Sequence, residues 1–234
     1  MSHTRIGSWV AVIIVSAFAM LSGCAKDVGR PMNEAPAVKP PACSALVLPA
    51  PNVAIPFGQS QFVTKWTVLG PFTFGENDFG GDPQTAAVDK EFMPDEGALD
   101  GTQKPPAASK AAWKVNEFKD AATAGMIDLD TFYNQIEHAA VYAVAWVVAT
   151  EDVNDAKLLV GSDDYIKVWI NGKLVHKYDT ARRAGEPDQD LASGIKLNKG
   201  MNRIVVKCVD VVLDWNFYLR FTTKDSKAIG VKPE

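Results

Sequence analysis

The sequence has few of the residues from which catalytic and metal sites are usually built. Its 234 residues include three histidines and three cysteines. His138 and His176 each stand alone, without the spacing of a paired metal site, and so few cysteines cannot form a disulfide framework. The chain also lacks a G-x-S-x-G elbow and a phosphate-binding loop. Acidic pairs such as Asp163 with Asp164 occur, but 28 acidic residues produce such pairs by chance. We therefore expect a protein that is not an enzyme.

Basic blocks and long apolar runs are missing as well. The 24 basic and 28 acidic residues give a net charge of −4, and without a basic cluster we expect no nucleic-acid partner. The apolar run from Trp9 to Leu21 is too short to span a bilayer, which needs roughly 20 apolar residues. Because Arg5 precedes this run and no acidic residue occurs before Asp27, the layout is that of a secretory signal.

Residues 21–24, Leu-Ser-Gly-Cys, resemble the lipobox of bacterial lipoproteins. The resemblance implies that residues 1–23 are a signal peptide and that Cys24 is lipidated, which anchors the protein to a membrane of the cell envelope. Two or more acyl chains give stable attachment. Ala25 stands where an aspartate would indicate retention in the inner membrane, so we expect the outer membrane. Two alternatives stay open: cleavage after the small-x-small motif at residues 17–19 would release a soluble protein, and Cys24 could form a disulfide.

Residues 24–60 contain half of the fourteen prolines, a composition that disfavours helices and strand ladders and is typical of a semi-rigid tether. Cys43 lies in this segment and could pair with Cys208 in an oxidising periplasm. Cys208 alternates with Ile204 and Val206 on one face of an expected strand, which equally fits a buried free thiol.

Short strand-like segments separated by turn signals fill most of residues 61–224, and residues 225–234 form a short tail. The turn at Asn171-Gly172 favours a type I′ hairpin, and residues 215–222 alternate with period two. Residues 139–150 are apolar on both faces; their length also fits a buried helix, but valines and aromatics favour a strand. Residues 73–112, called the excursion below, are rich in Gly, Asp, Pro and Ala and predict an irregular insertion. The pattern predicts an all-β sandwich.

Several motifs resemble those of a known family in the order in which they occur. They are Trp-Thr-Val-Leu-Gly-Pro-Phe at 66–72, the stretch from Gly161 to Val175, the stretch from Leu197 to Lys207, and Phe-Tyr-Leu-Arg at 217–220. They are similar to galactose-binding-like jelly rolls, which are related to the sugar-binding domain of family 2 glycosidases and to carbohydrate-binding modules. The resemblance covers residues 62–222 and implies a jelly-roll fold. Asp163 and Asp164 are interpreted as structural, because aspartates between strands readily bond backbone amides.

Candidate binding residues follow from the polar and aromatic groups expected at the loop rim. Sugar sites combine an aromatic ring with a few polar groups, and the candidates here are Trp215, Arg182, Arg183, Asp188 and Asp190. Trp169 is a further candidate, because it shares a strand face with Tyr165 and Lys167. That face is either a concave binding surface or is covered by the excursion.

A structural calcium ion is a further hypothesis. Glu76, Asp78 and Asp82 cluster carboxylate oxygens around glycines, as calcium loops do, although the spacing is not that of an EF-hand. No other cofactor is expected.

Two functions are compatible with these features. The first is a membrane-anchored lipoprotein that presents a non-catalytic, carbohydrate-binding sandwich to a polysaccharide. The second is a structural or assembly subunit that binds an envelope or extracellular protein, with the excursion as its docking element.

Overall fold

A computed structural model describes residues 46–48, 62–119 and 125–223 of the chain. All described residues belong to one compact unit, Lys39–Glu234. The predicted signal peptide, Cys24, Cys43 and the tail at 225–234 lie outside the described residues. Within the described ranges, no helix combines the length and the apolar character that a membrane span requires.

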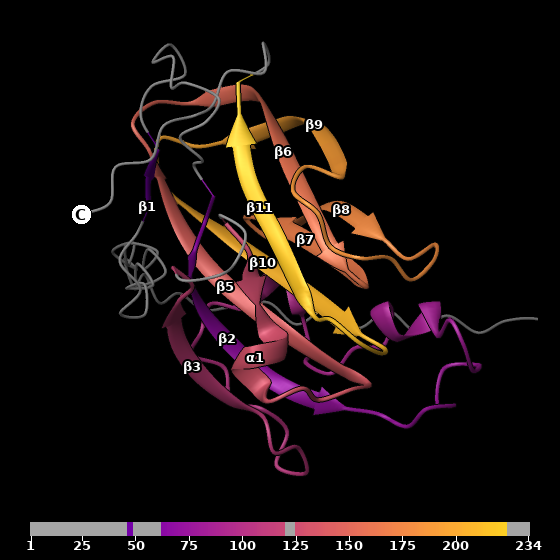
Figure 1. The fold of residues 1–234 in the computed structure, drawn as a ribbon. Coiled ribbons are helices and arrows are strands. Elements are labelled where there is room, and N and C mark those ends of the chain that lie inside the picture. The colour runs from indigo at the N-terminus through magenta and orange to yellow at the C-terminus, as the bar shows by residue number, and fades with distance from the viewer. Residues whose placement is uncertain (1–45, 49–61, 120–124, 224–234) are drawn as a thin grey trace, which may run out of the picture. The chain divides into compact units, whose positions relative to one another are not determined.

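The described strands form two sheets (Figure 1). The larger has seven strands in the order β3-β2-β5-β10-β7-β8, with β1 also pairing with β5; the smaller has four in the order β4-β11-β6-β9. Their bounds are β1 Leu46–Leu48, β2 Lys65–Thr73, β3 Ala112–Glu117, β4 Ile127–Asp128, β5 Ala139–Ala149, β6 Val153–Asp163, β7 Tyr165–Ile170, β8 Lys173–Tyr178, β9 Asp190–Leu197, β10 Gly200–Asp210 and β11 Asn216–Thr222. A short helix, α1 Leu129–Tyr133, precedes β5.

The eight strands from β4 to β11 have jelly-roll topology. Along the chain, β4, β6, β9 and β11 enter the smaller sheet, whereas β5, β7, β8 and β10 enter the larger. Each sheet therefore joins strands that are distant in sequence, as β10 does between β5 and β7. The predicted all-β sandwich with a jelly roll is confirmed, and residues 139–149 form a central strand rather than a helix.

One expectation for the tether is wrong. We expected residues 24–60 to form no strand ladder, but β1 pairs in parallel with β5, with Leu46 opposite Val147. The three residues of β1 lie in the proline-free stretch between Pro41 and Pro49, so their amides are free to donate to the ladder.

The core consists of two layers separated by the larger sheet. Between the sheets lies a cluster that includes Ile204, Val206 and Cys208 of β10; Cys208 is a buried free thiol. A second cluster lies on the outer face of the larger sheet, where Val205 and Val209 of β10 contact residues of the excursion. The alternation within β10 therefore places apolar side chains in both layers.

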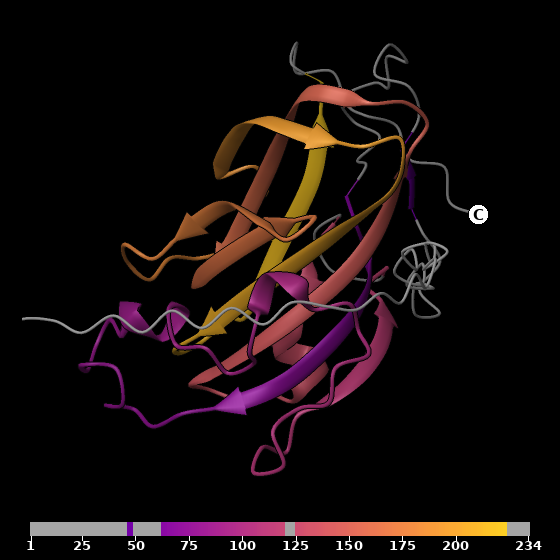
Figure 2. The ribbon, with the colours of Figure 1, turned by 180° about the vertical axis from the view of Figure 1, so that it is seen from behind.

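The excursion covers the outer face of the larger sheet, and Figure 2 shows it from that side. As predicted, it is largely irregular, with two 3-10 helices, η1 Thr85–Val88 and η2 Glu96–Ala98. Its buried residues Val88, Met93 and Leu99 pack on this face. Of the two alternatives for the face of Trp169, the structure shows the covered one.

Candidate functional site

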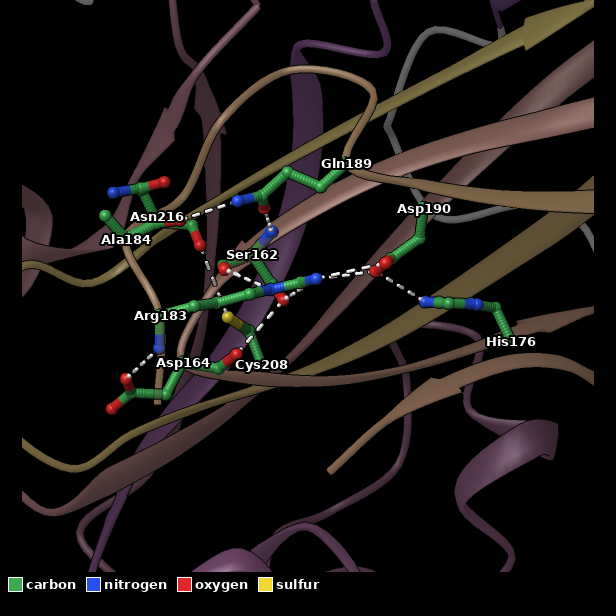
Figure 3. Close-up of polar contacts among 9 residues, drawn as sticks. All are labelled: Ser162, Asp164, His176, Arg183, Ala184, Gln189, Asp190, Cys208 and Asn216. Atoms are coloured by element: carbon green, nitrogen blue, oxygen red, sulfur yellow. Dashed lines mark hydrogen bonds and ion pairs between the residues drawn. The ribbon is translucent and has the colours of Figure 1, made fainter. Parts of the chain in front are cut away.

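The loop at residues 179–189 joins β8 to β9 and carries several of the predicted binding residues. Arg183 is engaged within the protein (Figure 3): its Nη1 and Nη2 lie 3.0 and 2.5 Å from the carboxylate oxygens of Asp190. Its Nε donates to the Ser162 carbonyl at 3.1 Å, and its Nη2 donates to the Ser162 hydroxyl at 3.0 Å. The guanidinium also stacks on Tyr178, with Cζ 3.5 Å from the ring centroid. These contacts, called the clasp below, hold the loop on the sandwich.

The clasp extends across the open edge between the two sheets. His176 on β8 and Asp190 at the start of β9 meet at 3.1 Å, and these strands are the edges of the larger and smaller sheets. Burial lowers the pKa of His176. Burial alone would raise the pKa of Asp190, but its hydrogen bond to Arg183 and the neighbouring charges hold it below its usual value. Arg183 and Asp190 thus bind each other within the clasp.

We expect Arg183→Ala to lower the free energy of unfolding by about 3 kcal/mol, because it leaves Asp190 partly buried without its partner. The matched control is Arg182→Ala, whose exposed ion pair with Asp82 is worth about 0–1 kcal/mol. Urea denaturation of both variants measures the difference. Equal losses would contradict a structural role for Arg183.

The free energy of unfolding is also expected to depend on pH through His176. Because the folded pKa of His176 lies below 6.5, stability is retained above that pH and falls as His176 is protonated in more acidic solution.

The structural interpretation of Asp163 and Asp164 is confirmed. Asp164 accepts hydrogen bonds from the amides of Val211 at 2.9 Å and Arg183 at 3.3 Å, and Asp163 accepts one from Gly185 at 3.3 Å. Burial raises the pKa of both carboxyl groups, that of Asp163 to about 7. Asp164 therefore joins the end of β10 to the loop at 179–189.

Two further candidates also make internal contacts. Asp188 forms an ion pair with Arg220, with its Oδ1 2.8 Å from Nε. The expected rim position of Trp215 is wrong, because its side chain is fully buried and stacks on Tyr133 with ring centroids 5.6 Å apart. Trp215 does share a face with Phe217, as predicted, but that face points between the sheets.

Trp169 lies on the outer face of the larger sheet and is 8% exposed. Gly97 of the excursion packs against its ring, so that a β-carbon at Gly97 would lie 2.7 Å from the indole Cδ1. The excursion therefore covers part of the ring surface on which a sugar would stack.

A cavity of about 220 Å³ lies where β5 begins and β10 ends, and we call it the end pocket. It brings together Glu76, Asp82 and Arg182, three residues singled out from the sequence for two different reasons. Asp78 does not line it and instead accepts a hydrogen bond from the Gly75 amide at 2.7 Å. The lining residues are Glu76, Asn77, Asp82, Gln84, His138, Arg182, Val211 and Val212.

Hydrogen bonds in the end pocket define which groups are available to a ligand. Arg182 binds both oxygens of Asp82, at 3.0 and 3.1 Å. The buried Gln84 lies with its Nε2 3.2 Å from Nδ1 of His138. An amide nitrogen only donates, so in the neutral ring Nδ1 accepts and the proton lies on Nε2. Within the described part of the chain, Nε2 of His138 and the Glu76 carboxylate have no hydrogen-bond partner.

The backbone around the end pocket adopts unusual conformations. Gln84 and His138 have φ values of 51°, in the left-handed region that non-glycine residues rarely adopt. His138 is held there by hydrogen bonds from its amide to Val211 and from the Phe74 amide to its carbonyl. Such conformations cluster at functional sites. Sequence reasoning missed Gln84 and His138 as site residues, because no pattern of residues predicts that a glutamine or a histidine adopts a left-handed backbone conformation.

The calcium hypothesis stays a prediction. Among the described residues, no group of three or more histidine, cysteine, aspartate or glutamate side chains is arranged to hold a metal ion. Arg182 already neutralises Asp82. If calcium nevertheless binds near Glu76 and Asp82, a chelator will lower the melting temperature; an unchanged melting temperature would remove the hypothesis.

Comparisons with known proteins give no family assignment. No family model matches the chain, and no curated protein is similar to it. Among solved structures, a β-glucuronidase from Ruminococcus gnavus is 9% identical with a TM-score of 0.38, and the match covers 70% of this chain and 29% of that one. A β-glucuronidase from an uncultured Clostridium sp. is 10% identical with a TM-score of 0.36, over 73% and 31% of the two chains. A GH31 α-xylosidase from Xanthomonas citri is 11% identical with a TM-score of 0.33, over 74% and 16%. The chain spans less than a third of the length of each, and at these scores the likeness carries no argument about function.

Proposed function

We propose that this protein is a lipid-anchored envelope protein whose jelly-roll domain binds carbohydrate in the end pocket without catalysing a reaction. The observation that carries the proposal is that several polar groups without a hydrogen-bond partner among the described residues line one small cavity. Glu76 and Asn77 come from the excursion, and His138 from the segment before β5, while Val211 and Val212 provide an apolar wall. Sites for small ligands combine apolar surface with a few such polar groups.

The hydrogen-bonding groups suit sugar hydroxyls, which both donate and accept. The Glu76 carboxylate accepts, the Nε2–H of His138 donates, and the Asn77 amide does both. A volume of about 220 Å³ lies below the roughly 300 Å³ at which sites for drug-sized ligands begin, which favours a ligand of about one sugar ring.

The same geometry favours binding over hydrolysis. Glycoside hydrolysis ordinarily uses two carboxyl groups across the scissile bond. The two carboxylates that line the end pocket belong to Glu76 and Asp82, and Arg182 holds both oxygens of Asp82. Glu76 is then the one carboxylate among the described pocket residues that is free to contact a ligand.

The anchor rests on the sequence alone. The Leu-Ser-Gly-Cys motif at 21–24 supports lipidation of Cys24, and the proline-rich segment that follows supports presentation of the domain away from a membrane, for which we propose the outer membrane. Mass spectrometry of the mature protein is expected to find an acylated N-terminus at Cys24, and Cys24→Ser is expected to release the protein from membranes. An unmodified N-terminus at Met20 would contradict the anchor.

A glycan array tests the binding function. The probe protein is the chain from residue 24 with Cys24→Ser, compared with the same chain carrying Glu76→Gln. We expect binding to a sugar and a loss of about tenfold or more in affinity for the variant, because a hydrogen bond to a charged group is worth about 1.5–3 kcal/mol. Glu117→Gln, an exposed glutamate outside the pocket, is the control. Silence across the array, or equal binding by the Glu76 variant, would contradict the proposal.

A further inference from the structure

Gln84 is a buried glutamine of the end pocket, and its side chain connects two separate segments of the chain. The residue is 2% exposed. Its Oε1 accepts a hydrogen bond from the Phe79 amide at 3.2 Å, and its Nε2 lies 3.2 Å from Nδ1 of His138. Phe79 and Gln84 belong to the excursion, whereas His138 belongs to the segment before β5. Gln84 therefore links the loop that carries Glu76 to the histidine of the pocket.

The two side-chain hydrogen bonds of Gln84 run in one direction, because a main-chain amide can only donate. The Phe79 amide requires an acceptor, which is Oε1, so the Nε2–H group of Gln84 faces His138. Interchanging the two amide atoms would place the Nε2–H group against the Phe79 amide and leave that amide without an acceptor. Phe79 thus sets the orientation of the Gln84 amide, and Gln84 sets which nitrogen of His138 carries the proton.

The backbone of Gln84 and the ring of His138 are held in place as well. The Gln84 amide donates to the Gly81 carbonyl at 2.6 Å, and its carbonyl accepts from the Ala87 amide at 3.0 Å. These bonds maintain a left-handed conformation that is unfavourable for glutamine. The His138 ring packs edge-on against Phe74, with ring centroids 6.0 Å apart. The donor and acceptor positions are therefore set before a ligand binds.

We propose that Gln84 is a specificity-determining positioning residue of the end pocket. It holds the neutral His138 ring with the proton on Nε2, so that the ligand atom at this nitrogen must be a hydrogen-bond acceptor. A site built around one such bond rejects ligands that cannot form it, because a polar group is then left unpaired. On a sugar, a hydroxyl oxygen, the ring oxygen or an acetamido carbonyl meets this requirement, whereas an ammonium group only donates and does not. The effect on the ligand rests on the proposed function, but the position of the proton is a property of the protein alone.

Gln84→Glu reverses the hydrogen bond to His138 with little change in shape. One carboxylate oxygen still accepts from the Phe79 amide, and the other accepts from a proton on Nδ1 of His138. Imidazole ¹⁵N spectra of the chain from residue 24 with Cys24→Ser, recorded without ligand at about pH 8, show which nitrogen is protonated. We expect Nδ1 of His138 to be unprotonated in this parent chain and protonated in the variant. His176, which lies in the clasp, is the internal control, and its signals should not change.

Gln84→Met is the second variant, and it distinguishes positioning from mere support of the fold. Methionine has a similar length but forms neither hydrogen bond, so the His138 proton is free to occupy either nitrogen. Titration calorimetry at the same pH uses a sugar retained on the array. We expect Gln84→Glu to weaken binding about tenfold, because Nε2 of the neutral ring no longer donates, and Gln84→Met to weaken it less. A purely structural role predicts the opposite order, because glutamate keeps both bonds and methionine loses both.

Thermal melting verifies that both variants fold. An unprotonated Nδ1 in Gln84→Glu, equal binding by all three proteins, or weaker binding by Gln84→Met than by Gln84→Glu would overturn the inference and leave the proposed function standing. If the parent chain binds no sugar, the proposed function fails, and the ¹⁵N spectra still support or overturn the control of the His138 proton by Gln84.

Discussion

Lys207→Ala is expected to lower the free energy of unfolding by about 3–5 kcal/mol, the range for removing one partner of a buried ion pair. Nζ of Lys207 is buried beneath the excursion, where it donates to the carbonyls of Val88 and Lys90 and pairs with Glu96 at 2.9 Å. Burial lowers the pKa of Lys207 to about 8, although the Glu96 charge opposes this effect. Removing the ammonium leaves a buried carboxylate and two carbonyls without their donor.

The same substitution is expected to loosen the excursion from the sheet. Limited proteolysis should then cleave within residues 73–112 before the rest of the domain, and urea denaturation measures the loss in stability. Lys177→Ala is the control, because Lys177 forms only exposed ion pairs, with Asp89 and Asp179, worth about 0–1 kcal/mol each. A loss no larger than that of Lys177→Ala would show that Lys207 does not hold the excursion.

Asp210→Asn is expected to stabilise the protein at pH 8 by several kcal/mol, because each pH unit between the ordinary and the folded pKa costs about 1.4 kcal/mol. Asp210 is fully buried at the end of β10, and neither carboxyl oxygen has a hydrogen-bond partner among the described residues. Burial, assisted by the nearby charge of Asp164, raises its pKa to about 9. Asparagine has nearly the same shape and cannot ionise, so it removes the energetic penalty of keeping this group neutral.

The sign of the pH dependence follows from the raised pKa of Asp210. Because the folded state holds the proton of Asp210 more tightly than the unfolded state does, the contribution of this carboxyl group to stability is largest below the ordinary pKa of 3.8. That contribution is lost as the pH rises toward 9. The stabilisation by Asp210→Asn should therefore shrink toward pH 4 and grow toward pH 8 in urea denaturation. Asp214→Asn, an exposed neighbour, should change little. Destabilisation by Asp210→Asn at pH 8 would contradict this account.

Local patterns predicted most of the strands, with β1 and β4 as exceptions, but they did not predict on which side each face is buried. The Asn171-Gly172 turn occurs as predicted, with left-handed φ at both residues and Ile170 paired with Lys173. Trp215 illustrates this failure. The period-two pattern correctly places Trp215 and Phe217 on one face of the strand, but only the pairing of β11 with β4 and β6 decides that this face lies between the sheets.

The end pocket could be anticipated only in part. The sequence singled out Glu76, Asp82 and Arg182 as separate candidates, but their meeting depends on a contact across about 100 residues. Gln84 and His138 are likewise 54 residues apart, and nothing local predicts their hydrogen bond. From the sequence, Arg183 is as suitable a ligand-binding residue as Arg182. Only the structure shows that the Arg183 guanidinium is already hydrogen-bonded to Asp190 and Ser162.

The ¹⁵N spectrum of the histidine side chains tests sugar binding in the end pocket most directly. The expected mature chain has two histidines, His138 in the pocket and His176 in the clasp. On titration with a sugar retained on the array, we predict that the Nε2 signal of His138 shifts in proportion to occupancy while both signals of His176 stay in place. A sugar that binds without moving the His138 signal, or that moves His176 instead, would contradict the account.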